Sequence, residues 1–153
     1  MADLEEILQA INVTEAPRLN PVAHVRRLTR LQDLQRAEHV NKVRQARWRA
    51  MTPKLRNKSL AFRLVSERSW SNRQFRCLDR LWTRESNWNH HAVNRSSGAY
   101  GIPQALPASK MRGAGRDWRI NPETQIKWGL KYIKSRYGKP CTAWAHSRAH
   151  GWY

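Results

Sequence analysis

The chain has 153 residues, with 29 Lys or Arg against 11 Asp or Glu, which gives a formal net charge of +18 at pH 7. This length allows one domain plus an extension. No stretch reaches the roughly 20 apolar residues that a membrane-spanning helix needs, so we predict no membrane span.

The sequence begins with an acidic amphipathic segment, Met1 to Ile11, whose apolar residues are Leu4, Ile7, Leu8 and Ile11. The segment is neither long nor apolar enough, nor preceded by positive charge, to be a secretory signal peptide. We therefore see no export signal here.

A helical pattern follows Pro17 and Pro21, with an apolar residue at every third position. These residues are Val22, Val25, Leu28, Leu31, Leu34, Ala37, Val40 and Val43. A spacing of three drifts by about 60° per step on an α-helix, so the positions spiral around the axis instead of forming one stripe. We expect residues 1–70 to form an extended helix or helical hairpin that docks on other protein chains rather than on the rest of this chain.

Positive charge extends through both parts of the sequence. Residues 18–63 contain 13 Lys or Arg against Asp33 and Glu38, and residues 71–153 contain 15 against four acidic residues. Such an excess fits a solvated helix surface, or a surface for nucleic acid, an anionic cell envelope or an acidic protein. A polyanionic target such as a wall that bears teichoic acid explains both parts, whereas DNA explains only the first.

The composition changes near residue 70, where we place the boundary between the extension, 1–70, and a C-terminal domain, 71–153. Six of the eight tryptophans lie in that domain: Trp82, Trp88, Trp118, Trp128, Trp144 and Trp152. Most of them must fill the core of a domain this small.

A carboxyl group lies at the end of an apolar helix face. Phe75, Leu78 and Trp82 recur at spacings of three and four, and Glu85 is the next position on that face. Apolar surroundings penalise the charged form of a carboxyl group, so the pKa of Glu85 should rise and its proton should stay available near neutral pH. Glu85 is therefore a candidate general acid, although a Glu at a helix end is more commonly just solvated.

A long helix is predicted from Asn121, with an N-cap, a first-turn Pro122 and Gly138 as terminator. Ile126, Leu130, Ile133 and Tyr137 lie on one face, and Trp128 and Tyr132 lie on another. A helix that is apolar on two sides is buried. Strand signals amount at most to a short hairpin around residues 97–104, so we expect a mainly α domain.

The segment SGAYGIPQ, residues 97–104, resembles a motif of the lytic transglycosylase domains found in actinobacterial proteins and their phages, which belong to the lysozyme-like superfamily. The resemblance continues through ALPASKM, AGRDW, NPETQIKWGLKYIKSRYG and AWAHS to GWY, and so covers residues 71–153. It implies a lysozyme-like fold and cleavage of the MurNAc–GlcNAc bond of peptidoglycan.

The resemblance also implies roles for individual residues. Glu85, in RESNW, matches the catalytic acid of the family. Ser97, Gly98, Tyr100 and Gln104 belong to the motif that lines the sugar cleft, and Tyr132, in GLKYI, matches the aromatic residue that bounds it. We add Trp88, beside the acid, as a tryptophan that stacks on a sugar ring. Where relatives read GWNP, this chain has Asn87 to His90, in a loop that faces outward in the family.

A second catalytic carboxyl group is not predicted, although glycosidases ordinarily use two. Asp79 lies about 240° around the helix from Glu85, and Glu123 fits the first turn of its helix. Asp117, in the loop GAGRDW, remains the one candidate, but a structural loop role explains it better. With one carboxyl group, the MurNAc acetamido group or C6 hydroxyl must quench the intermediate, and the C6 route gives a 1,6-anhydro product.

Neither a metal nor a cofactor is predicted. His90 and His91 are half of a metal site at most, and the sequence has neither HExxH nor paired CxxC. His146 is interpreted as a packed histidine rather than a second base.

Cys77 and Cys141 form either a free buried pair or a disulfide. An enzyme whose substrate lies outside the membrane works where disulfides persist, and a bridge would tie the helix of Glu85 to the terminal segment. We therefore name the pair as a disulfide candidate.

The missing export signal favours a phage enzyme, either a virion component, most plausibly of the tail, that opens the host wall from outside, or a lysis enzyme released by other means. The extension favours the virion, because it needs a permanent partner. The alternative is a structural virion or DNA-associated protein whose lysozyme-like domain only binds glycan.

Overall fold

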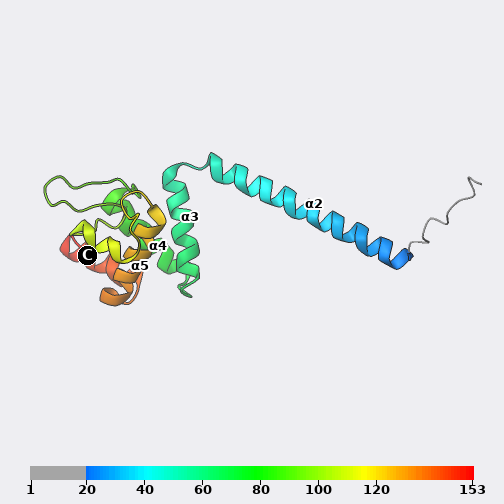
Figure 1. Ribbon diagram of the computed structural model, residues 1–153. Coiled ribbons are helices and arrows are strands. Elements are labelled where there is room, and N and C mark those ends of the chain that lie inside the picture. Colours follow the sequence, from blue (N-terminus) through cyan, green and yellow to red (C-terminus); the bar gives the residue numbers. More distant parts are fainter. Residues whose placement is uncertain (1–19) are drawn as a thin grey trace, which may run out of the picture. The chain divides into compact units, whose positions relative to one another are not determined.

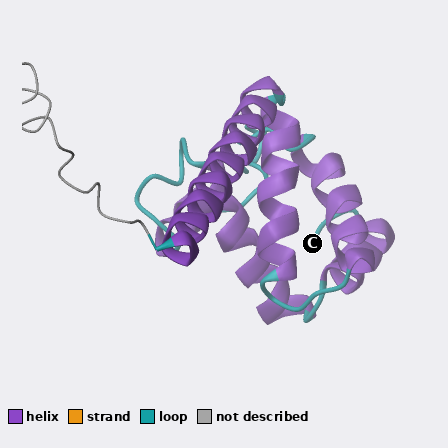
Figure 2. Cartoon of the chain, turned by 90° about the vertical axis from the view of Figure 1, so that its right-hand side faces the viewer, coloured by secondary structure: helices purple, strands orange, loops and turns teal. Residues whose placement is uncertain are grey.

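The computed structural model describes residues 20–153 and is built of helices joined by loops (Figures 1 and 2). The elements are α2 (Pro21–Ala50), α3 (Pro53–Ser66), α4 (Asn72–Ser86), the 3-10 helix η1 (Ala108–Gly113), α5 (Pro122–Tyr137) and α6 (Pro140–His150). Residues 20–153 contain no strand, and the expected hairpin is reduced to two isolated antiparallel bridges, which pair Tyr100 with Val93 and with Ala105. The mainly α prediction is confirmed.

The chain divides into two units at the step from Arg49 to Ala50, and all of α2 but its last residue lies in the first unit. The predicted helix is present, and its large apolar side chains are exposed: Val25 is 59% and Leu34 is 58% accessible. The spiral placement explains this, because no single side of α2 collects enough apolar surface to be buried. None of the helices in the described residues combines the length and apolar character needed to cross a bilayer. The segment Met1 to Ile11 lies outside the described residues.

Helix α3 corrects the predicted boundary at residue 70. It packs on α4 and α5, buries Ala61, Leu64 and Val65, and belongs to the compact unit that begins at Ala50. The expectation that residues 1–70 dock only on other chains is therefore wrong for 53–66. Unlike in α2, three apolar residues of α3, Ala61, Leu64 and Val65, lie at spacings of three and one, so they share a buried face.

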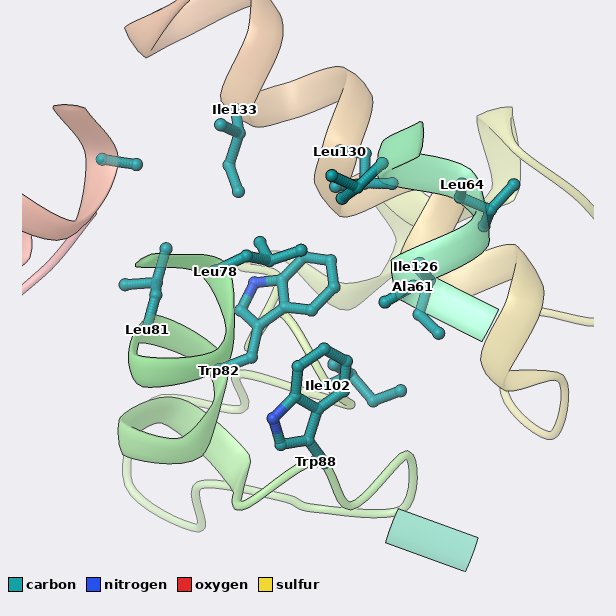
Figure 3. Packing of buried hydrophobic residues seen from close by; sticks show 12 residues of the cluster. Ala61, Leu64, Leu78, Leu81, Trp82, Trp88, Ile102, Ile126, Leu130 and Ile133 are labelled. Atoms are coloured by element: carbon teal, nitrogen blue, oxygen red, sulfur yellow. The ribbon is translucent and has the colours of Figure 1, made fainter. Parts of the chain in front are cut away.

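The core of the compact unit is formed by apolar residues from α3, α4, α5 and α6 and from the segment after α4, which contributes Trp88 and Ile102 (Figure 3). Trp82 and Trp88 lie at its centre, with ring centroids 5.2 Å apart and planes at 77°, an edge-to-face pair. Gly129 leaves room for the Trp82 ring against α5, because a Cβ atom there would lie 2.7 Å from that ring. A second cluster of Ala105, Met111 and Trp118 supports the loops around η1.

The predicted disulfide is present in the structure. It joins Cys77 in α4 to Cys141 in α6 across 64 residues of sequence. The backbone N–H of Cys141 also donates to the side chain of Gln74, and Arg84 donates to the carbonyl of Ser147. These links hold the two ends of α6 against the helix that carries Glu85.

Candidate active site

Glu85 lies in the last turn of α4, half-buried, as the apolar face predicted. Burial raises the pKa of this carboxyl group above its ordinary value, and the neighbouring Arg84 cation opposes that rise only in part. The group is therefore disposed to keep its proton at higher pH than a solvated glutamate.

The chain reverses directly after Glu85 through two consecutive left-handed residues, Asn87 (φ 51°) and Trp88 (φ 65°). The N–H groups of Asn87 and Trp88 donate to the carbonyls of Thr83 and Trp82, which closes the end of α4. Asn tolerates the left-handed conformation better than most non-glycine residues, which suits Asn87 to this position. Two side chains of α3 hold this reversal, since Lys54 donates to the side chain of Asn87 and Asn57 donates to the carbonyl of Trp88.

Trp88 is buried completely, which overturns its predicted contact with substrate, although its neighbours Asn87 and Asn89 are exposed as an outward-facing loop requires. Its indole N–H donates to the carboxylate of Asp79 at 2.8 Å, and its ring packs on Trp82. The left-handed reversal turns the side chain inward, which a helical spacing argument does not anticipate. A ring without exposed surface cannot stack on a sugar.

The loop from Asn94 to Gln104 brings the predicted motif next to the end of α4, since the hydroxyl of Ser86 donates to the carbonyl of Ile102 at 2.9 Å. Ser97 and Gly98 are exposed at the tip of this loop. Tyr100 is half-buried against Trp118, and its hydroxyl donates to the carbonyl of Arg119. The tip is thus free to meet a ligand, whereas the Tyr100 hydroxyl already has an internal partner.

Two glutamines hold the loop in place. Gln104, itself left-handed (φ 48°), donates from its amide nitrogen to the carbonyls of Ala92 and Gly101. Gln125 of α5 is fully buried: its oxygen accepts from the N–H of Ile102 at 2.9 Å, and its nitrogen donates to the carbonyls of His90 and Trp118. Sequence reasoning missed Gln125, although a glutamine beside Ile126 on a buried helix face was a usable signal.

Tyr132 lies on α5, half-buried and stacked on Trp128 with ring centroids 5.3 Å apart. Its ring also meets that of Tyr153 at 6.0 Å. The hydroxyl of Tyr153 accepts from the indole of Trp82 at 2.8 Å and donates to the carbonyl of Pro103 at 2.9 Å. Burial and then the nearby Glu85 charge raise the pKa of Tyr153, so its hydroxyl stays neutral beside the acid. Sequence reasoning did not single out Tyr153, which joins α4, the loop and Tyr132.

The comparison with protein families decides what this arrangement is. A family model described as the transglycosylase SLT domain matches residues 71–149, which is more than half of the chain. The chain belongs to the transglycosylase SLT domain family. Membership indicates peptidoglycan lytic transglycosylase activity, with peptidoglycan as substrate. No curated protein and no solved structure matches the chain.

The other carboxylates of the SLT domain are engaged in structural contacts. Asp79 pairs with Lys58 at 2.7 Å, and Glu123 pairs with Lys127 at 2.9 Å at the start of α5. Asp117 accepts from the side chains of Asn121 (2.6 Å) and Thr124 (2.7 Å), and these hydrogen bonds, that of Asn121 first, lower its pKa. These contacts agree with the loop role expected for Asp117.

The histidines of the SLT domain do not gather around Glu85 with other ligands, and within residues 20–153 no three His, Cys, Asp or Glu side chains are placed to hold a metal. The rings of His90 and His91 lie 3.9 Å apart, and burial, followed by the nearby His91, lowers the pKa of His90. His146 packs between His150 and Trp152, as a packed histidine should.

Proposed function

We propose that this SLT domain cleaves the β-1,4 bond between MurNAc and GlcNAc with Glu85 as its one catalytic carboxyl group. The observation that carries the proposal is the contrast among the carboxylates. Glu85 is half-buried with a raised pKa, whereas Asp79, Asp117 and Glu123 are each paired or hydrogen-bonded within the fold. A general acid must hold its proton, and paired carboxylates do not.

The reaction that follows from one carboxyl group has two proton transfers. Glu85 gives its proton to the glycosidic oxygen as the bond to C1 of MurNAc breaks, which releases the GlcNAc end. The C6 hydroxyl of the same MurNAc then attacks C1, either directly or after transient capture by the acetamido group, and the Glu85 carboxylate takes the hydroxyl proton. The product is a 1,6-anhydro sugar, and Glu85 is again protonated.

The loop tip and the aromatic residues supply the surroundings for this chemistry. We assign substrate contacts to Ser97, Gly98 and Gln104 on one side and to Tyr132 on the other. The amide oxygen of Gln104 is not used by the two bonds that its nitrogen makes, which leaves it for a sugar hydroxyl. The Tyr100 ring supports the loop from below through Trp118.

Substitution of the acid tests the proposal. Glu85→Gln should keep the fold and glycan binding and reduce the cleavage rate by about 10² to 10⁴, the usual contribution of general acid catalysis. Zymography on cell walls measures the residual cleavage, and mass spectrometry shows whether the products carry 1,6-anhydro or reducing ends. Residual activity near that of the parent would refute the role of Glu85, and products with only reducing ends would mean that water attacks, with Asp117 as the missed second group.

We further propose that the protein is a phage virion component, of the tail, that opens the host wall during infection. The sequence resemblance of residues 71–153 to domains of actinobacterial phages motivates this, and α2 adds exposed apolar side chains that a permanent protein partner would cover. Detection of the chain in purified particles tests the location. Its absence from particles, with activity in lysates, would assign it to lysis instead.

The second candidate function is a structural or DNA-associated protein whose SLT domain only grips glycan. The exposed, basic α2 is the feature that favours it. Wild-type protein that binds walls but clears none on a zymogram would support this alternative.

A further inference from the structure

A shallow surface depression on the outer side of α5 collects positive charge from three separate elements. Its cationic lining residues are Arg68 after α3, Lys110 of η1, and Lys127, Lys131 and Lys134 of α5. We call these five residues the α5 basic face. The one acidic residue in its lining, Glu67, lies near Arg63, which also meets Glu123.

Most of these cations have no anionic partner among residues 20–153. Of the five, Lys127 alone forms an ion pair with a carboxylate of the described residues, namely Glu123. Arg68 and Lys110 donate to backbone carbonyls, those of Leu64 and Leu106. Several unpaired cations around one concavity raise the local concentration of anions and favour a ligand with repeated negative charge.

Aromatic rings form part of the same depression. Trp128 and Tyr132 line it, stacked with only 10° between their planes. Tyr132 also contacts Tyr153, whose hydroxyl bonds to Trp82 of α4 and to Pro103 of the loop. The α5 basic face is therefore continuous, through three rings, with the candidate active site.

We propose that the α5 basic face binds a phosphodiester polymer of the cell wall, attached to the glycan strand that the active site cleaves. This inference rests on the proposed function, because the glycan in the active site brings its attached polymer to Tyr132. Four of the five cations are lysines, which act as point charges on flexible stems and suit phosphates at variable positions. The location next to the glycan cleft favours such a polymer over nucleic acid.

Charge reversal on the face, compared with the same reversal elsewhere, tests the proposal. The test variant is Lys110→Glu with Lys131→Glu, and the matched control is Arg73→Glu with Arg76→Glu on α4, two exposed cations outside the depression. Both pairs change the net charge equally and are made in the full chain with Glu85→Gln, so cleavage cannot disturb the binding measurement. The probes are the isolated wall phosphodiester polymer and a DNA duplex.

We expect the test variant to bind the isolated polymer roughly tenfold more weakly than the control and with a smaller salt dependence, since fewer counterions are released. With Glu85 intact, both variants should cleave walls stripped of the polymer at the parent rate. Equal losses of binding in the two variants, a loss of cleavage on stripped walls confined to the test variant, or tighter binding of DNA than of polymer would each overturn the proposal. Failure of the parent itself to cleave stripped walls would instead refute the proposed function. The binding measurement, which does not depend on cleavage, would still show whether the α5 basic face binds the polymer.

Discussion

Helices α2 and α4 both carry several large apolar residues, but α4 buries most of them in the core whereas α2 leaves them exposed. In α4 the apolar residues recur at spacings of three and four, and Leu78, Leu81 and Trp82 are fully buried. In α2 they recur every three residues, and Val22, Leu28 and Val40 remain about half exposed or more. The comparison teaches that the phase of apolar residues around the axis, rather than their number, decides which helix enters a core.

The largest expected effect is that of removing α3, which lies between α2 and α4 in sequence but packs with α4 in the core. A fragment of residues 50–153 should unfold cooperatively, whereas one of residues 71–153 should not. The shorter fragment loses Leu64 and Val65, each contributing about 1.5 to 3 kcal/mol by burial, out of a usual net stability of about 5 to 15 kcal/mol. Thermal melts followed by circular dichroism measure the difference, and a cooperative melt of 71–153 near that of 50–153 would contradict it.

Removal of the disulfide should lower the stability of the compact unit that contains α4 and leave the helicity of α2 unchanged. Cys77→Ser with Cys141→Ser should destabilise the compact unit by about 4 kcal/mol, because the bridge closes a loop of 64 residues in the unfolded chain. The low-temperature helix signal of an α2 peptide should not respond to reducing agent. Urea unfolding with and without reductant measures the effect, and the double variant, which reductant cannot change, is the control.

The same Leu→Ala substitution in each helix should change the stability by very different amounts. Leu78→Ala should cost about 2 to 5 kcal/mol, since it leaves a cavity in the core. Leu34→Ala, in α2, should change the stability by less than about 0.5 kcal/mol, because the side chain is already exposed. Similar shifts in denaturant midpoint for the two variants would mean that α2 is buried in solution.

The smallest expected effect is a pH dependence that belongs to α4 alone. Folding raises the pKa of Glu85 above its ordinary value of 4.5, so its contribution to stability is complete below that value and is lost as pH rises through the folded pKa. Wild type should therefore lose stability relative to Glu85→Gln as the pH rises from 4 toward neutrality. Parallel stability curves for the two proteins would show that Glu85 is as solvated in the folded state as in the unfolded one.

Periodic features of the fold could be predicted from the sequence. Both ends of α5, the inward face of α4 and the pairing of Cys77 with Cys141 follow from caps, spacing and cysteine placement, and the structure has all three. These features are local, or depend on a few strong residue preferences, so a single sequence carries them.

Features that depend on distant partners could not be predicted. Trp88 lies beside the acid in sequence, but the two left-handed residues that turn it inward are held by Lys54 and Asn57 of α3. The compact unit extends back from residue 71 to Ala50 for a related reason, since the charge of 18–63 conceals the buried face of α3. The bonds of Gln125 and Tyr153 join segments that only the folded chain brings together.

The buried amide of Gln125 restricts which residues can stand at position 125 and at position 101, which it contacts. Its three bonds require one acceptor and two donors at the reach of a glutamine side chain, a set that Glu, Lys, Met or the shorter Asn cannot supply. Gly101 is tied to the same position, since even a methyl group there would lie 2.4 Å from the Gln125 oxygen. Positions 101 and 125 are therefore coupled, because a side chain at 101 would displace the Gln125 amide and with it the bonds that hold Ile102, His90 and Trp118.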